Sequence, residues 1–73
     1  MKDKALFAAP EADGTFTVGI AERDTPGWVA HSKGWATLEA AQAEAAAGNA
    51  DLGLTVDEAA DIRASSMRAG AIE

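Results

Sequence analysis

The chain has 73 residues, no cysteine and a formal net charge of −6 at pH 7. This length corresponds to a single domain over residues 1–73, and the missing cysteines exclude disulfides and thiolate metal sites. The negative charge argues against direct nucleic-acid binding through phosphate contacts, and no apolar stretch approaches the ~20 residues of a membrane span. We therefore expect a cytoplasmic protein that binds neither nucleic acid nor membrane.

The large apolar side chains are few. Hydrophobic residues make up 48% of the chain, but many of them are alanine. A domain this small is marginally stable on its own core, and small folds commonly gain stability from disulfides, a metal or a partner subunit. With disulfides excluded, the sequence predicts a homo-oligomer, and a dimer is favoured.

The N-terminal half predicts a small antiparallel sheet of two to three strands. Phe16, Val18 and Ile20 alternate with small or polar residues, so their side chains share one face of a strand. Gly14 and the Pro26–Gly27 pair mark the turns on either side. The strands are expected over residues 4–9, 15–22 and 28–32, and the short connections favour antiparallel pairing.

Two helices are predicted in the C-terminal half, over residues 38–51 and 56–69. Thr37 precedes a run rich in Ala, Glu and Gln and is a plausible N-cap. Thr55 and Glu58 have the spacing of a capping box, and Gly70 is a candidate for the residue just beyond the second helix. The expected fold is α+β, a small antiparallel sheet followed by two helices packed on one of its faces.

One candidate binding site combines aromatic and basic residues. Trp28 and Trp35 bracket His31 and Lys33, and Arg23 lies close by in the sequence. Tryptophan is enriched at binding hot spots and stacks on bases or cations. These residues predict a site for a planar anionic ligand or a partner, while burial of both tryptophans in the core or at a dimer interface is the alternative.

A second candidate is an acidic face. From residue 39 onward there are two basic and seven acidic residues, and Glu39, Glu44, Asp57 and Asp61 are the candidates to meet a basic protein surface. Solubility, and for Asp57 and Asp61 a favourable interaction with a helix N-terminus, are the alternatives.

The sequence contains no recognisable catalytic or metal-binding motif. His31 is the only histidine, and it has neither cysteine nor a second histidine to complete a metal site. There is no phosphate-loop or dinucleotide motif. We expect no catalytic residues, no metal and no cofactor, and hence a protein that is not an enzyme.

Several short stretches resemble small proteins encoded by bacteriophages and prophages. They run from Phe16 to Ile20, through Pro26-Gly27-Trp28, to Leu52-Gly53-Leu54-Thr55 and Ser65-Ser66-Met67. The resemblance implies an accessory protein of the host cytoplasm that binds a host protein and modulates or inhibits it. An oligomeric protein that binds or sequesters a nucleotide-like small molecule is the alternative.

Overall fold

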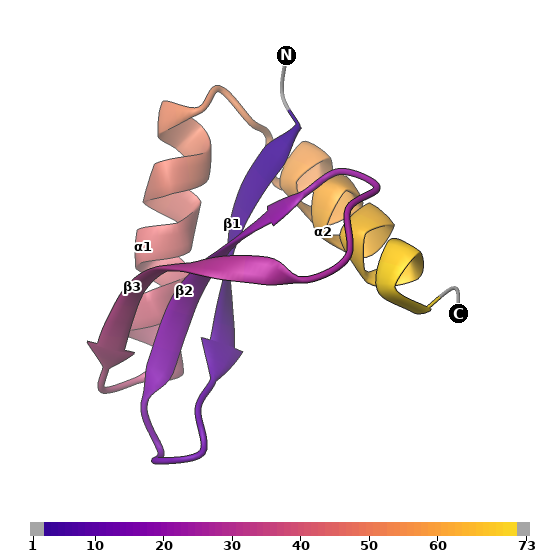
Figure 1. The fold of residues 1–73 in the computed structure, drawn as a ribbon. Helices are drawn as coiled ribbons and strands as arrows, with labels where there is room; N and C mark the ends of the chain where they lie inside the picture. The colour runs from indigo at the N-terminus through magenta and orange to yellow at the C-terminus, as the bar shows by residue number, and fades with distance from the viewer. Residues whose placement is uncertain (1–2, 72–73) are drawn as a thin grey trace.

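The computed structural model describes residues 3–71. Three strands come first, β1 (Lys4–Pro10), β2 (Phe16–Glu22) and β3 (Trp28–Trp35), and they are followed by two helices, α1 (Leu38–Asp51) and α2 (Val56–Ala71) (Figure 1). The predicted α+β class, with a small antiparallel sheet preceding two helices, is confirmed. Neither helix has the length and apolar character needed to cross a membrane, as far as residues 3–71 are concerned.

The sheet is a meander in the order β1-β2-β3. Leu6 lies opposite Ile20, and Ile20 lies opposite Val29 on its other side. Residues directly opposite each other share a face, so these three side chains lie on the same side of the sheet. This is the side against which α1 packs, in a cluster with Val18, Ala41 and Ala45.

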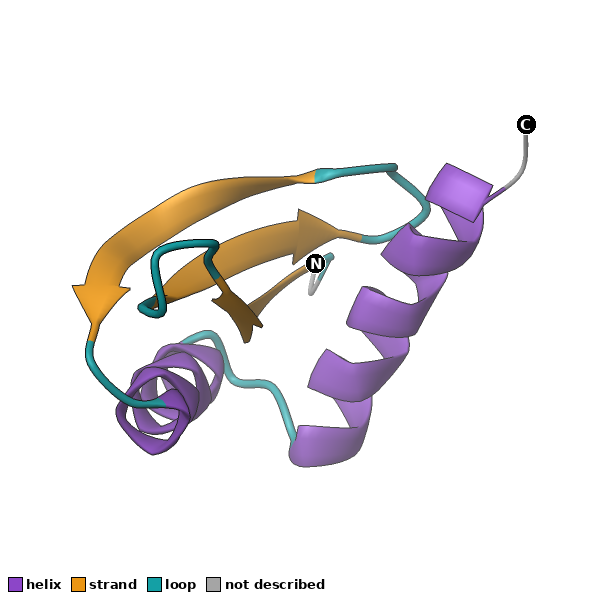
Figure 2. Ribbon diagram, turned by 90° about the horizontal axis from the view of Figure 1, so that it is seen from below, coloured by secondary structure: helices purple, strands orange, loops and turns teal. Residues whose placement is uncertain are grey.

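The two helices flank β1 from opposite sides. α1 contacts the side that carries Leu6, whereas α2 packs its Ile62 and the preceding Leu54 against Ala5. Consecutive strand residues point to opposite faces, so each helix packs against the sheet from its own side of β1. Figure 2 shows the two helices well apart, one toward the lower left and the other, which leads to the C-terminus, at the right. A strand buried on both sides, such as β1, lacks the apolar–polar alternation that reveals a single buried face.

β3 extends further than predicted. The sequence predicted that this strand ends at residue 32, but it continues to Trp35. Two register shifts against β2 accommodate the extra residues, as expected of β-bulges. Gly34 has a φ of 80°, which glycine adopts without a steric penalty, so the strand passes this position rather than ending there.

The predicted helix starts are confirmed. The Thr37 hydroxyl accepts from the backbone N–H of Ala40 at 3.1 Å, while Thr55 and Glu58 exchange reciprocal hydrogen bonds of 2.9 and 3.1 Å. The prediction for Gly70 is wrong, because α2 continues through it. A Cβ atom at Gly70 would lie 3.7 Å from Cβ of Pro26, so this glycine lies where α2 passes close to the β2–β3 turn.

Candidate functional site

The two tryptophans lie on opposite faces of the sheet. Trp35 is half-buried against the cluster that contains Leu6, and its indole N–H donates to Ser32 Oγ at 2.9 Å. Trp28 instead meets the ring of Phe7 edge-on, with ring centroids 5.1 Å apart. Because Leu6 and Phe7 are consecutive residues of one strand, the structure does not bring the two indoles together in a single aromatic patch.

Trp28 packs against Gly19 and Phe7 of its own chain. Gly19 lies beneath its ring, and a Cβ atom there would overlap Trp28 and lie 2.9 Å from Cζ of Phe7. The guanidinium carbon of Arg63 lies 3.9 Å from the centre of the Phe7 ring, within the range of a cation–π interaction. Trp28 is still 40% exposed, so part of it borders the surface.

Two residues predicted for different sites are joined in an ion pair. Arg23 Nη1 lies 3.2 Å from Asp61 Oδ2, and Arg23 Nε lies 3.8 Å from Asp3 Oδ1. The Asp61 side chain is 66% exposed, and exposed pairs of this kind contribute little to stability. Arg23 and Asp61 therefore link the end of β2 to α2.

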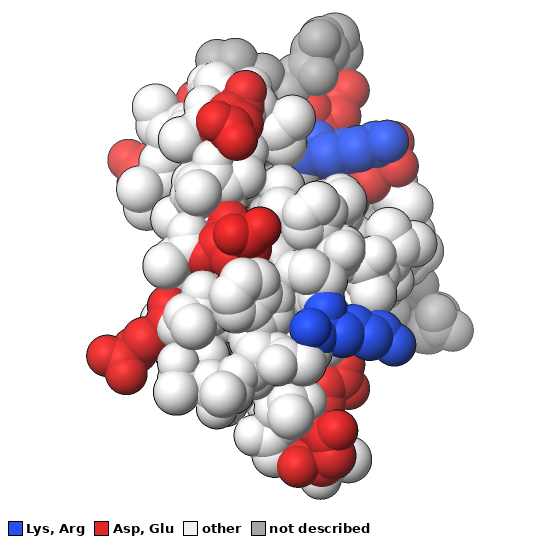
Figure 3. Space-filling view, turned by 90° about the vertical axis from the view of Figure 1, so that its left-hand side faces the viewer, with Lys and Arg blue, Asp and Glu red and all other residues white. Residues whose placement is uncertain are grey.

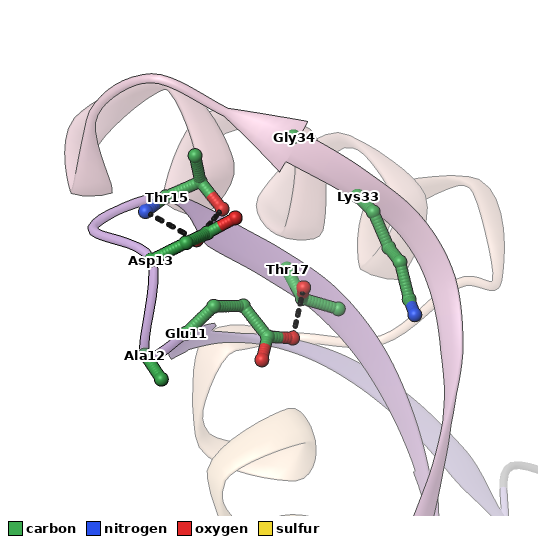
Figure 4. A pocket seen from close by; sticks show the side chains of 7 residues that line it. All are labelled: Glu11, Ala12, Asp13, Thr15, Thr17, Lys33 and Gly34. Atoms are coloured by element: carbon green, nitrogen blue, oxygen red, sulfur yellow. Dashed lines mark hydrogen bonds between the residues drawn. The ribbon is translucent and has the colours of Figure 1, made fainter.

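Lys33 lines a polar recess of about 460 Å³ between β3 and the β1–β2 turn (Figure 4). The buried Thr17 donates its hydroxyl to Glu11 Oε2 at 2.5 Å. Asp13 accepts from the hydroxyl of Thr15 at 2.6 Å and from its backbone N–H at 3.0 Å, and these bonds, the hydroxyl first, lower the pKa of Asp13. Both carboxylates thus hold the turn, and within residues 3–71 neither forms an ion pair with Lys33.

His31 and Glu44 line one recess between α1 and the sheet. Its volume is about 400 Å³. The strands contribute Lys4, Leu6, Ile20 and His31, and the other wall is formed by α1 and the residue after it, through Glu44, Ala47, Gly48, Asp51 and Leu52. The structure therefore places His31 of the predicted aromatic–basic site and Glu44 of the predicted acidic face in the same recess.

A second recess of about 510 Å³ adjoins the first at Lys4 and Ile20 and continues to the β2–β3 turn and Val29. Val29 is 66% exposed and Leu52 is 50% exposed. The exposure of Val29 shows that α1 leaves this part of the sheet face uncovered. We call the two recesses together the sheet-face groove.

Carboxylates dominate the α1 side of the groove. Glu44 and Asp51 are seven residues apart, so they lie on one stripe of the helix with Ala47 and Gly48 between them. Neither side chain has a hydrogen bond or ion pair to another described residue. Figure 3, which views the α1 side of the molecule, shows acidic side chains along this face, with basic ones toward its right-hand margin.

The other predicted acidic residues are dispersed. Glu39 and Asp57 are exposed in the first turns of α1 and α2, where negative charge is favourable. Asp61 pairs with Arg23, and like Asp57 it lies on α2 rather than beside Glu44 on α1. No group of three or more potential ligands that could hold a metal ion occurs among the described residues.

Sequence reasoning missed Lys4, Val29, Asp51 and Leu52 as groove residues. The interval of seven from Glu44 was a usable signal for Asp51. Leu52 offered no such signal, because it lies just beyond the last turn of α1 and is half exposed.

Comparison of the chain with protein-family models, with curated proteins and with solved structures gives no match.

Proposed function

We propose that this chain is a non-catalytic binding protein and that the sheet-face groove docks a segment of another protein. The observation that carries the proposal is the open apolar lining of the groove, where Val29 and Leu52 remain exposed beside Glu44 and Asp51, two carboxylates that pair with no other residue within 3–71. Exposed apolar surface rimmed by charged residues is typical of an interaction site. The resemblance to phage accessory proteins supports a host protein as the partner, and binding would modulate or inhibit it.

Both edges of the sheet are protected against pairing with a strand of another protein, which favours docking on the sheet face. The outer edge of β1 is covered at Leu6 by the side-chain amide of Asn49, and the strand ends at Pro10, which has no N–H. The β3 edge is interrupted by two register shifts and carries Lys33. Bulges, lysine and proline are common means of discouraging strand addition, so the face is the better docking surface.

The role of the buried serines supports a non-catalytic protein. Ser65 Oγ accepts from the N–H of Asp24 at 2.8 Å and donates to its Oδ1 at 2.5 Å. Ser66 Oγ donates to the carbonyl of Thr25 at 2.7 Å. Both hydroxyls are therefore engaged in fixing the β2–β3 turn on α2, which is a structural role.

Site-specific photocrosslinking in bacterial cells tests the proposal. A photoreactive amino acid would replace Val29 in the groove, and Met67, 57% exposed on α2, would be the matched control position. We expect one discrete crosslinked protein from position 29 and not from position 67, and we expect Glu44→Lys to reduce it. Equal products from both positions, or none from position 29, would contradict docking in the groove.

A second candidate function is the binding of a nucleotide-like small molecule. The recess beside His31 has a volume of about 400 Å³, within the usual range for small-ligand pockets, and Lys4 and His31 supply groups that pair with anions. Native mass spectrometry of gently purified protein tests it. A reproducible added mass that is lost in Lys4→Gln and in His31→Ala would support this function, whereas a clean protein mass in the wild type would exclude it.

A further inference from the structure

The α1 wall of the groove has the features of a surface that accepts another helix. Ala47 is a small, exposed residue between Glu44 and Asp51, and a small side chain allows two helices to approach within the usual 8–10 Å between axes. The two carboxylates are two turns apart, about 10.5 Å along the helix at ~1.5 Å per residue. A second helix lying beside α1 would meet both of them.

The floor of the groove is suited to the same occupant. Ile20 and Val29 lie opposite each other on the exposed part of the sheet face, and Leu52, directly after α1, adds an apolar side chain to the α1 wall. Layered folds cover the apolar face of a sheet with helices. Here α1 covers only part of this face, so a helix from another chain would complete the layer.

The charges determine which kind of helix fits. Glu22, Glu44 and Asp51 border the groove, whereas Lys4 is the one lysine or arginine on it among the described residues. A second copy of this chain fits poorly, since it also carries a net charge of −6. Its α1 is acidic, and its Arg63 already faces Phe7.

We infer that the groove binds a basic amphipathic helix of a partner protein. The partner's apolar stripe packs on Ile20, Val29 and Leu52, and two cations seven residues apart pair with Glu44 and Asp51. This inference rests on the proposed function and specifies the partner segment for the same groove.

Binding of two synthetic helical peptides to the full chain tests the inference. Both peptides are about 18 residues long and share one leucine stripe; one carries lysine and the other glutamate at two positions seven apart. Methyl chemical shifts of Val29 and Leu52 report contact with the groove, while those of Ile62 and Met67 report the rest of the protein. Titration calorimetry at low and high salt measures affinity.

We expect the lysine peptide to bind at least tenfold more tightly than the glutamate peptide, to lose this advantage at high salt and to shift the Val29 and Leu52 signals. The double variant Glu44→Lys, Asp51→Lys should reverse the preference. Equal binding of both peptides would overturn the role of charge. Failure of both peptides would overturn the helix inference, whereas a crosslink at position 29 would still support the proposed function. Self-association of the unliganded chain that shifts the Val29 signal would overturn the inference of a basic partner helix and would identify a second copy of this chain as the occupant.

Discussion

The side-chain amide of Asn49 is hydrogen-bonded to both backbone groups of Leu6. Its Oδ1 accepts from the Leu6 N–H at 2.7 Å, and its Nδ2 donates to the Leu6 carbonyl at 2.9 Å. The amide thus takes the place of a neighbouring strand at the outer edge of β1. It also ties the last turn of α1 to the sheet.

Asn49→Asp should destabilise the protein by about 1–3 kcal/mol, the usual penalty for an unsatisfied buried partner. A carboxylate can accept from the Leu6 N–H but cannot donate to its carbonyl, and Leu6 is only 8% exposed. Urea denaturation measures the change. Gln42→Glu, an exposed amide-to-carboxylate change on the same helix, is the matched control, and an equal loss in both variants would refute the assigned role of Asn49.

Ser65→Ala should destabilise the β2–β3 turn by about 1–2 kcal/mol, because the N–H of Asp24 loses its acceptor. Asp24 has a φ of 56°, a region that non-glycine residues rarely occupy, and Ser65 holds it there through two hydrogen bonds. Thermal unfolding and amide exchange at Asp24 measure the effect. An Asp24 amide that stays equally protected in the variant would show that Ser65 does not hold the turn.

Gly19→Ala should destabilise the protein by roughly 1–3 kcal/mol, the range for overpacking. The added methyl would overlap the ring of Trp28 and crowd Phe7. In a Trp28→Ala background the cost of Gly19→Ala should fall, because the main obstacle is gone. A double-mutant cycle in urea measures this coupling, and additive single-variant effects would count against the contact.

Val29→Thr should leave the free energy of unfolding within about 0.5 kcal/mol of the wild type, as for ordinary surface changes. Val29 is 66% exposed, and threonine keeps the β-branched shape preferred in strands. Thermal unfolding of the isolated chain checks this. A loss as large as that of Gly19→Ala would mean that Val29 serves the fold rather than the groove.

Acidification should remove the stabilising effect of the Asp13–Thr15 bonds. These bonds lower the folded-state pKa of Asp13, so their stabilisation is complete above the unfolded pKa of about 4. It is lost as the pH falls through the lower, folded pKa. Thr15→Val should raise the Asp13 pKa toward its ordinary value, as followed by side-chain NMR titration, and an unchanged titration would exclude the hydroxyl as the main cause.

Local chemistry in the sequence determined the elements themselves. The alternation of Phe16, Val18 and Ile20 specifies a strand with one apolar face. The capping groups of Thr37, Thr55 and Glu58 act within one helical turn, so they specify the helix starts without reference to the rest of the chain. These signals are local, and they sufficed for the order and class of the fold.

Only the tertiary structure decided which faces of the sheet the helices cover and which they leave exposed. Burial of Ala5 and Leu6 on opposite sides of β1 depends on where two distant helices pack, and no pattern within the strand encodes it. The neighbours of the two tryptophans likewise depend on how distant segments pack, since Trp28 meets Phe7 of β1 and Trp35 packs on the cluster that contains Leu6. His31 and Glu44 came together, although thirteen positions apart, because α1 folds back over the sheet. The groove is thus a product of packing between elements, which determines which surfaces are left uncovered.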